Sequence, residues 1–187
     1  MMDPTDSQIA FRLRKLRTKF ARFDVDKDGY MAKEDFELMA KKMNELSNAT
    51  GEQAESCRQI FMHVADTFGF TPGMKLSRDE AAKNMNEAML KLSWKEQRAM
   101  CDNFYNVVFD AMDLDRDDHI SLEEYKTYTR VLAPDLSDED KVKCFNLIDT
   151  NQDGKISRAE FLEVAFGYLH KFEENEFSEL FYGPLVP

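Results

Sequence analysis

The chain has 187 residues, 43% of them hydrophobic, and a formal net charge of −11. This acidity argues against binding to the nucleic-acid backbone and favours cationic partners. Three widely spaced cysteines, an N-terminus without an apolar signal core and the lack of a membrane-length apolar run predict a cytoplasmic protein without disulfides or a membrane span.

The first predicted helix covers residues 7–23, where hydrophobic residues recur at alternating spacings of four and three. They form one stripe that faces a core: Ile9, Leu13, Leu16, Phe20 and Phe23. The remaining positions carry the basic residues Arg12, Arg14, Lys15, Arg17, Lys19 and Arg22. We expect this basic face to be solvated.

The acidic segment "DVDKDGYMAKED", residues 24–35, follows this helix directly. Side-chain oxygens recur at its positions 1, 3, 5 and 12, which are Asp24, Asp26, Asp28 and Asp35, and the Tyr30 backbone carbonyl is at position 7. A twelve-residue turn of this kind wraps oxygen ligands around a hard divalent cation. Because Asp35 is one methylene shorter than Glu, we expect Mg²⁺ to compete with Ca²⁺ here.

Residues 69–80, "GFTPGMKLSRDE", occupy the place of a second loop but have no carboxylate at positions 1, 3 and 5. We therefore expect this loop to bind no calcium and to pair with the first loop through a short strand at position 8. The predicted helices on either side cover residues 52–68 and 77–92. Ser77 and Glu80 have capping-box spacing, as do Ser93 and Glu96 before the next helix.

Two further loops follow, "DLDRDDHISLEE" at residues 113–124 and "DTNQDGKISRAE" at residues 149–160. The predicted ligands are Asp113, Asp115, Asp117, the His119 carbonyl and Glu124 in one loop, and Asp149, Asn151, Asp153, the Lys155 carbonyl and Glu160 in the other. Position 6 of the former loop is Asp118 rather than Gly. Because this position needs a positive φ, we expect Asp118 to cost backbone energy.

The three acidic loops share one pattern, in which an aromatic residue follows position 12, and the pattern resembles the calcium loop of EF-hand proteins. We call the four loops I (24–35), II (69–80), III (113–124) and IV (149–160). The sequence predicts an all-α fold of four EF-hands in two closely packed lobes, residues 1–92 and 93–187, around an internal apolar cavity or core. It predicts three calcium sites and no catalytic residue, and we expect a monomer.

Beyond the loops, the chain resembles two groups of four-hand proteins with a silent second hand. The stretches "VADTFGFTPGMKLSRDEAA", "CFNLIDTNQDGKISRAEFL" and "FYGPLV" are similar to sarcoplasmic calcium-binding proteins and, more closely, to the calcium-triggered coelenterazine-binding (luciferin-binding) proteins. The latter resemblance implies a cavity that holds coelenterazine and releases it to a luciferase when calcium rises. It also implies that Arg22 and Phe36 line the pocket.

Three alternatives to this carrier stay open on the sequence. A Met- and Phe-rich interior also suits a Ca²⁺/Mg²⁺ buffer without cargo, since Met fills irregular gaps. A calmodulin-like sensor would need an exposed groove, which the apolar tail after Phe177 is expected to fill. A calcium-regulated photoprotein fits less well, because this resemblance implies a Trp near the C-terminus and the single tryptophan is Trp94.

Overall fold

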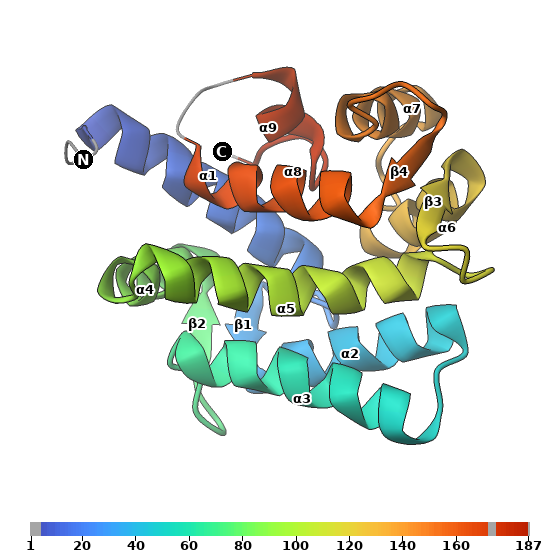
Figure 1. The fold of residues 1–187 in the computed structure, drawn as a ribbon. Helices are drawn as coiled ribbons and strands as arrows, with labels where there is room; N and C mark the ends of the chain where they lie inside the picture. The colour runs from blue at the N-terminus through green and yellow to red at the C-terminus, as the bar shows by residue number, and fades with distance from the viewer. Residues whose placement is uncertain (1–4, 172–174, 187) are drawn as a thin grey trace.

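The structure, a computed structural model, describes residues 5–171 and 175–186 and is built mainly from α-helices (Figure 1). In chain order the elements are α1 (Asp6–Phe23), β1 (Tyr30–Ala32), α2 (Lys33–Ser47), α3 (Gly51–Thr67), β2 (Lys75–Ser77), α4 (Arg78–Lys91), α5 (Trp94–Met112), β3 (His119–Ser121), α6 (Leu122–Leu132), α7 (Asp138–Ile148), β4 (Lys155–Ser157), α8 (Arg158–His170) and α9 (Glu176–Leu180). The predicted all-α class is confirmed, with a pair of helices around each of the four loops.

Side-chain caps fix where the helices around the loops begin. Ser77 accepts a hydrogen bond from the backbone N–H of Glu80, whose carboxylate accepts from the Ser77 N–H in return. Ser93 and Glu96 do the same at the start of α5. Both predicted capping boxes are therefore present, and each satisfies two N–H groups that have no partner within the helix.

Two short antiparallel sheets join the loops in pairs. Strands β1 and β2 place Met31 opposite Leu76, and β3 and β4 place Ile120 opposite Ile156. These four residues are at position 8 of their loops, so the predicted pairing through position 8 is confirmed. Loop II has kept its strand, which gives the backbone of loop I a hydrogen-bonding partner.

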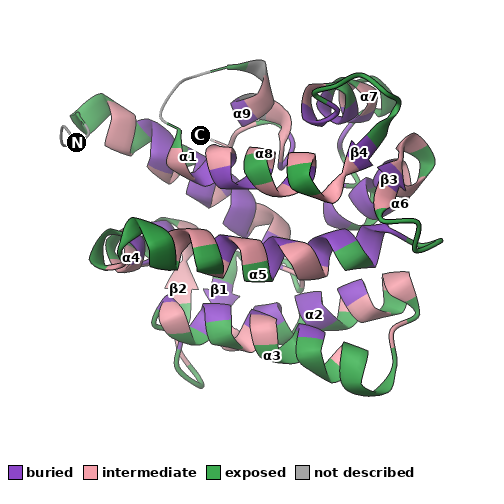
Figure 2. Cartoon of the chain, viewed as in Figure 1, coloured by how far each residue is buried: buried purple, intermediate pink, exposed green. Residues whose placement is uncertain are grey.

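Helix α5 crosses the middle of the molecule, with α2 and α3 on one side and α8 on the other (Figure 1). Helix α1 packs against α4 and α8. The boundary drawn at residues 92 and 93 falls in the short connection between α4 and α5. One buried cluster nevertheless continues across it, and Figure 2 shows buried surfaces on α1, α2, α3, α5 and α8 facing inward. The halves thus share a core.

The C-terminal segment lies along α1. The Tyr182 carbonyl accepts a hydrogen bond from Arg22 Nε at 2.7 Å, and the Val186 N–H donates to Thr18 Oγ1 at 3.0 Å. The side chain of Tyr182 is buried, and its hydroxyl lies 2.8 Å from that of Tyr105. The apolar tail is therefore anchored in the core by Tyr182, while Phe177, Leu180 and Phe181 pack against the core and are partly buried.

Much of the basic face of α1 is buried, so our expectation of a solvated face was wrong. Arg12, Lys15 and Lys19 are 6%, 1% and 3% exposed. Lys15 Nζ donates to the carbonyls of Tyr168 and Lys171 at the C-terminal end of α8, where a cation is favoured. Because α8 and the tail cover this side of α1, the helix has no fully solvated face, which periodicity alone does not reveal.

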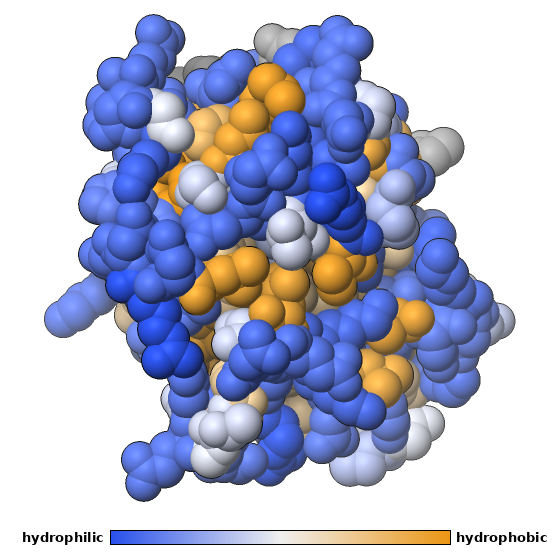
Figure 3. All heavy atoms as spheres, turned by 90° about the vertical axis from the view of Figure 1, so that its right-hand side faces the viewer, coloured by the Kyte–Doolittle hydropathy of each residue, from blue (hydrophilic) through white to orange (hydrophobic). Residues whose placement is uncertain are grey.

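Apolar side chains gather in patches on part of the surface. On the face turned toward the viewer in Figure 3, orange side chains form patches that blue side chains border. Among the described residues, no helix is long and apolar enough to cross a membrane. Cys57, Cys101 and Cys144 are buried and free, as expected for a chain without disulfides.

Candidate metal centres

Loops I, III and IV follow one backbone path. In each, the residues at positions 4 and 6 have positive φ: Lys27 and Gly29 (57° and 86°), Arg116 and Asp118 (61° and 62°), and Gln152 and Gly154 (58° and 87°). Loop II differs, since its positive φ angles belong to Gly69 and Gly73 at positions 1 and 5. The backbone thus separates the three acidic loops from loop II, which supports the prediction that loop II holds no ion.

Loop I gathers three carboxylates. Asp24, Asp26 and Asp28 each offer an oxygen within 4.8 Å of the others. Asp24 is 3% exposed, and its Oδ1 is buried without a hydrogen-bond partner in the described part of the chain. A buried carboxylate oxygen without a partner is costly, so it indicates a missing cationic ligand.

Loop III gathers Asp113, Asp115 and Asp117 within the same 4.8 Å limit. Both oxygens of Asp113 accept loop N–H groups, from Asp117 at 3.1 Å and from Asp118 at 3.0 Å. Burial raises the pKa of Asp113 above its usual value and outweighs these hydrogen bonds. A proton therefore competes with a metal ion more strongly at this carboxylate than at an exposed Asp.

Loop IV has the same arrangement with an amide in place of one carboxylate. Asp149 accepts from the N–H groups of Asp153 and Gly154, at 3.2 and 2.9 Å. Asn151 Oδ1 accepts from the Asp153 N–H, and Asn151 Nδ2 donates to Asp153 Oδ2, both at 2.9 Å. The side chains of Asn151 and Asp153 thus hold each other in place within loop IV.

The closing side chains tie the end of each loop to its start. Glu124 Oε1 accepts from the Leu114 N–H at 2.9 Å, and Oε2 accepts from the Ser121 N–H at 2.8 Å. Glu160 bonds in the same way to Thr150 and Ser157. These hydrogen bonds orient both carboxylates toward the first residues of their loops.

Two differences weaken the closing carboxylate of loop I. Asp35 accepts only from backbone N–H groups, of Val25 at 3.1 Å and Ala32 at 2.9 Å. In loops III and IV the position-9 serine hydroxyl adds a bond of 2.6 Å to the closing Glu. Burial raises the pKa of Asp35. For Glu160, burial also acts to raise the pKa, but the hydrogen bonds outweigh it and hold the pKa at about 2.

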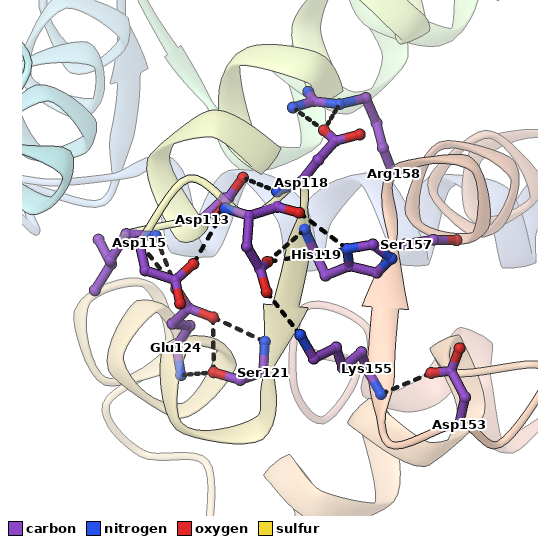
Figure 4. A network of polar contacts seen from close by, with 12 residues as sticks. Asp113, Asp115, Asp118, His119, Ser121, Glu124, Asp153, Lys155, Ser157 and Arg158 are labelled. Atoms are coloured by element: carbon purple, nitrogen blue, oxygen red, sulfur yellow. Dashed lines mark hydrogen bonds and ion pairs between the residues drawn. The ribbon is translucent and has the colours of Figure 1, made fainter.

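Arginines from loops II and IV reach the partner loops. Arg78 Nη2 donates to Asp24 Oδ2 at 2.9 Å, which leaves Asp24 Oδ1 available. Arg158, at the equivalent position 10, instead pairs with Asp118 at 2.8 Å, as Figure 4 shows, and with Asp110, also at 2.8 Å. Asp118 adopts the expected left-handed conformation, and its ion pair with Arg158 offsets part of the backbone cost.

The two residues assigned to a ligand pocket by resemblance lie in different surroundings. Arg22 is half-buried and binds the Tyr182 carbonyl and Asp135. Phe36 is 1% exposed and packs against Phe70, with 5.1 Å between ring centroids. Their role toward a ligand stays a prediction.

The sequence reasoning missed Lys19. Its ammonium lies 4.8 Å from the ring centroid of Phe104, 5.5 Å from that of Phe23 and 5.7 Å from that of Tyr105. Burial lowers its pKa to about 8. Within the described part of the chain, no carboxylate forms an ion pair with it. In the sequence, Lys19 is adjacent to Phe20, a residue of the apolar stripe. Helical periodicity nevertheless placed Lys19 on the basic face, which we expected to be solvated.

The donor set of the three acidic loops fits calcium. Each loop supplies carboxylate, amide or carbonyl oxygens, the ligands that hard divalent cations prefer, and the predicted ligand at His119 is its backbone carbonyl rather than its imidazole. The unpartnered Asp24 Oδ1 is the clearest structural sign of such a ligand. The assignment of the individual ligands stays a prediction.

Comparison with known proteins agrees with this chemistry. A family model described as an EF-hand domain pair matches residues 13–130 and 104–166. The chain is 38% identical over 182 residues to a luciferin-binding protein of Renilla reniformis, covering 97% of this chain and 98% of that one. It is also 29% identical over 133 residues to a sarcoplasmic calcium-binding protein of Perinereis vancaurica tetradentata, covering 67% of this chain and 72% of the relative.

Among solved structures, the fold is similar to a crystal structure of the coelenterazine-binding protein from Renilla muelleri in its calcium-loaded apo form. The TM-score is 0.74 at 38% identity, and the match covers 97% of this chain and 100% of that one. The similarity therefore extends over both lobes and the tail, beyond the loops themselves.

Proposed function

Because the chain belongs to the EF-hand family, in which it is a relative of the luciferin-binding proteins, we propose that it is a calcium-triggered carrier of a coelenterazine-like ligand. Loops I, III and IV would hold three Ca²⁺ ions. The predicted ligands Asp24, Asp113 and Asp149 begin these loops, and Asp35, Glu124 and Glu160 close them. The protein would act as a binding protein rather than an enzyme, deliver its cargo to a luciferase and work in the cytoplasm as a monomer.

The burial of the Lys19 ammonium is the observation that supports ligand binding in addition to calcium binding. An ammonium buried among aromatic rings without a carboxylate is unfavourable unless a ligand compensates it. Coelenterazine offers aromatic rings for the cation–π environment and oxygen atoms as hydrogen-bond acceptors. The hydroxyl pair of Tyr105 and Tyr182 adds a second polar point in the same core.

The closing carboxylates connect the loops to this core. The residue after each of them is a buried aromatic: Phe36 after Asp35, Tyr125 after Glu124 and Phe161 after Glu160. Bound calcium would supply the positive charge toward which these carboxylates move. A shift of the carboxylate at the start of α2, α6 or α8 displaces the adjacent ring, because packed interiors transmit such movements. Calcium binding thereby loosens the contacts that a core ligand needs.

The core is nearly filled in this conformation. The cavity beside Lys19, lined also by Phe104, Tyr105 and Leu169, has a volume of about 10 Å³. This is room for about one water molecule, so a ligand must displace side chains to enter. The similar structure of the Renilla muelleri protein is that of a calcium-loaded apo form.

The filled core also supports a second candidate, a Ca²⁺/Mg²⁺ buffer without cargo. The identity to a sarcoplasmic calcium-binding protein fits this function. The two functions make different demands on Lys19: the carrier needs a cation at this position to bind its ligand, and the buffer does not. A buffer would be more stable with an apolar residue at position 19, since burial then costs no charge.

Titration of coelenterazine into metal-free protein, followed by absorbance or fluorescence, tests the proposal. We expect binding that reverses when calcium is added. Lys19→Met should weaken ligand binding at least tenfold while calcium binding persists. Lys141→Met is the matched control, because Lys141 is equally buried but paired with Asp138. If neither protein binds coelenterazine and the calcium sites are intact, the buffer is the better assignment.

A further inference from the structure

The two even-numbered loops share a tetrapeptide that the calcium ligands do not explain. Loop II contains "KLSR" at residues 75–78, and loop IV contains "KISR" at residues 155–158. In both, the lysine is at position 7. The backbone carbonyl of Lys155 is a predicted ligand of loop IV, whereas loop II has no predicted ligand. The lysine side chain is therefore free for another purpose.

Both lysine side chains cross to the neighbouring loop. In the strand pairs, Lys75 is opposite Ala32 and Lys155 is opposite Ser121, which places each lysine beside an odd-numbered loop. Lys75 Nζ forms an ion pair with Asp28 Oδ2. Lys155 Nζ forms one with Asp117 Oδ2 at 2.6 Å, and Figure 4 shows its side chain extending from β4 toward loop III. The contact thus recurs in both lobes.

The lysines take the carboxylate oxygen that the loop itself leaves available. Asp28 Oδ1 accepts from the Tyr30 N–H at 2.9 Å, and Asp117 Oδ1 accepts from the His119 N–H at 2.9 Å. In each case Oδ2 is the remaining oxygen of position 5, a predicted metal ligand. An ammonium on this oxygen and a metal ion at the same site exclude or repel each other.

Loop IV has no such lysine. The residue at position 7 of its partner, loop III, is His119, whose Nδ1 lies 3.1 Å from the Asp117 carbonyl oxygen. Asp153 instead accepts from the Lys155 backbone N–H and from Asn151 Nδ2, both at 2.9 Å. Within the described residues, loop IV is therefore the acidic loop whose position-5 carboxylate has no ion pair with an ammonium group.

We propose that Lys75 and Lys155 are internal competitors that lower the metal affinity of loops I and III, so that loop IV fills first. This inference rests on the proposed calcium loops and is independent of any cargo. The ammonium groups must return to water before the position-5 carboxylates bind an ion. Because these ion pairs are partly exposed, the competition is moderate, and affinity should change by roughly three- to tenfold.

Loop I offers its own reporter for the test. Tyr30 at position 7 can sensitise the luminescence of Tb³⁺ bound in loop I, whereas loops III and IV carry His119 and Lys155 there. The part of the signal that Tyr30→Phe removes reports loop I, and calcium displacement of that part measures the calcium affinity of loop I. We expect Lys75→Met to raise calcium affinity at loop I by roughly three- to tenfold.

Lys27→Met is the matched control, because it removes an equal charge from loop I itself without breaking a contact to Asp28. It should change affinity less than Lys75→Met does. Equal effects of the two variants, or no effect of Lys75→Met at unchanged helix content by circular dichroism, would overturn the proposal.

Calorimetry extends the test to the C-terminal pair. Lys155→Met should raise the calcium affinity of one site by a similar factor. The difference in affinity between the tightest and the next-tightest site should then become smaller. Arg116→Met, the control, should reduce this difference less than Lys155→Met does. A wild-type protein that binds no calcium would contradict the proposed calcium loops themselves. Normal wild-type binding with an unchanged Lys155→Met isotherm would contradict only the role of the lysines.

Discussion

The two loop pairs start from nearly the same sequence, "KLSR" and "KISR", and use its arginine differently. In the N-terminal pair Arg78 reaches Asp24, the first carboxylate of loop I. In the C-terminal pair Arg158 is held by Asp118 and Asp110, and the first carboxylate of loop III has no arginine partner in the described structure. Loop II, which we predict to hold no ion, and loop IV, a proposed calcium loop, thus both act on their neighbours.

The residue at position 6 of the partner loop accounts for the difference. Loop I has Gly29 there, which offers no carboxylate, and loop III has Asp118. Asp118 tolerates a φ of 62° and gives Arg158 a nearby anion. A departure from the usual glycine is therefore explained by an ion pair to the other loop, and the comparison shows that each loop must be understood together with its partner.

Of the variants that distinguish the two loop pairs, the one that removes the closing carboxylate of loop IV should change calcium affinity the most. Glu160→Gln keeps the size of the side chain but removes the charge that the Ser157 and Thr150 donors stabilise. We expect loss of one of three calcium sites, with affinity lowered on the order of a hundredfold. Calorimetric stoichiometry measures this, and three intact sites in the variant would show that loop IV is not closed by Glu160.

Arg78→Met should destabilise the metal-free N-terminal pair. Among the described residues, the buried Asp24 carboxylate would keep only the Gly29 N–H as a partner. We expect a loss of about 2 kcal/mol in the free energy of unfolding without calcium, and a smaller loss with it. Arg158→Met is the comparison, and its loss should be below about 1 kcal/mol because its partners are exposed. Equal losses in urea titrations would refute the distinction between the two arginines.

Asp35→Glu should make loop I more like loops III and IV. A longer carboxylate can offer both oxygens to a large cation, so calcium preference over magnesium should rise by roughly tenfold. Ala32 leaves the new Glu without the serine hydroxyl that Glu124 and Glu160 receive. Ala32→Ser on the same background should add to the gain. Competition between Mg²⁺ and Tyr30-sensitised Tb³⁺ measures it, and an unchanged preference would mean that side-chain length does not decide selectivity.

Asp118→Gly should have the smallest effect. Relief of the left-handed backbone favours the variant by up to about 1 kcal/mol, but loss of the ion pair to Arg158 opposes it. We therefore expect a change in loop III affinity below about threefold, in place of the gain that backbone strain alone predicts. A gain of about fivefold, which corresponds to the full strain relief of about 1 kcal/mol, would indicate that Arg158 contributes nothing to loop III.

The sequence predicted local features well because they depend on residues close together in the chain. Loop registers, the capping boxes at Ser77 and Ser93, and the strand pairing at Met31 and Ile120 all follow from fixed spacings. The burial of Lys15 and Lys19 did not follow, because it depends on α8 and the tail covering α1. The cross-loop contacts of Lys75 and Arg78 also need the three-dimensional pairing of two loops. Predictions failed where distant segments meet.

The central claim is that calcium and a core ligand oppose each other's binding. Coupling between two ligands is reciprocal. A coelenterazine-like ligand must therefore lower the affinity for calcium by the same factor by which calcium lowers the affinity for the ligand. The most direct measurement is a calorimetric calcium titration of the protein with and without saturating coelenterazine. We predict weaker calcium binding in its presence, by at least tenfold summed over the sites, which corresponds to about 1.4 kcal/mol. Identical calcium isotherms with ligand bound would contradict a calcium-triggered carrier.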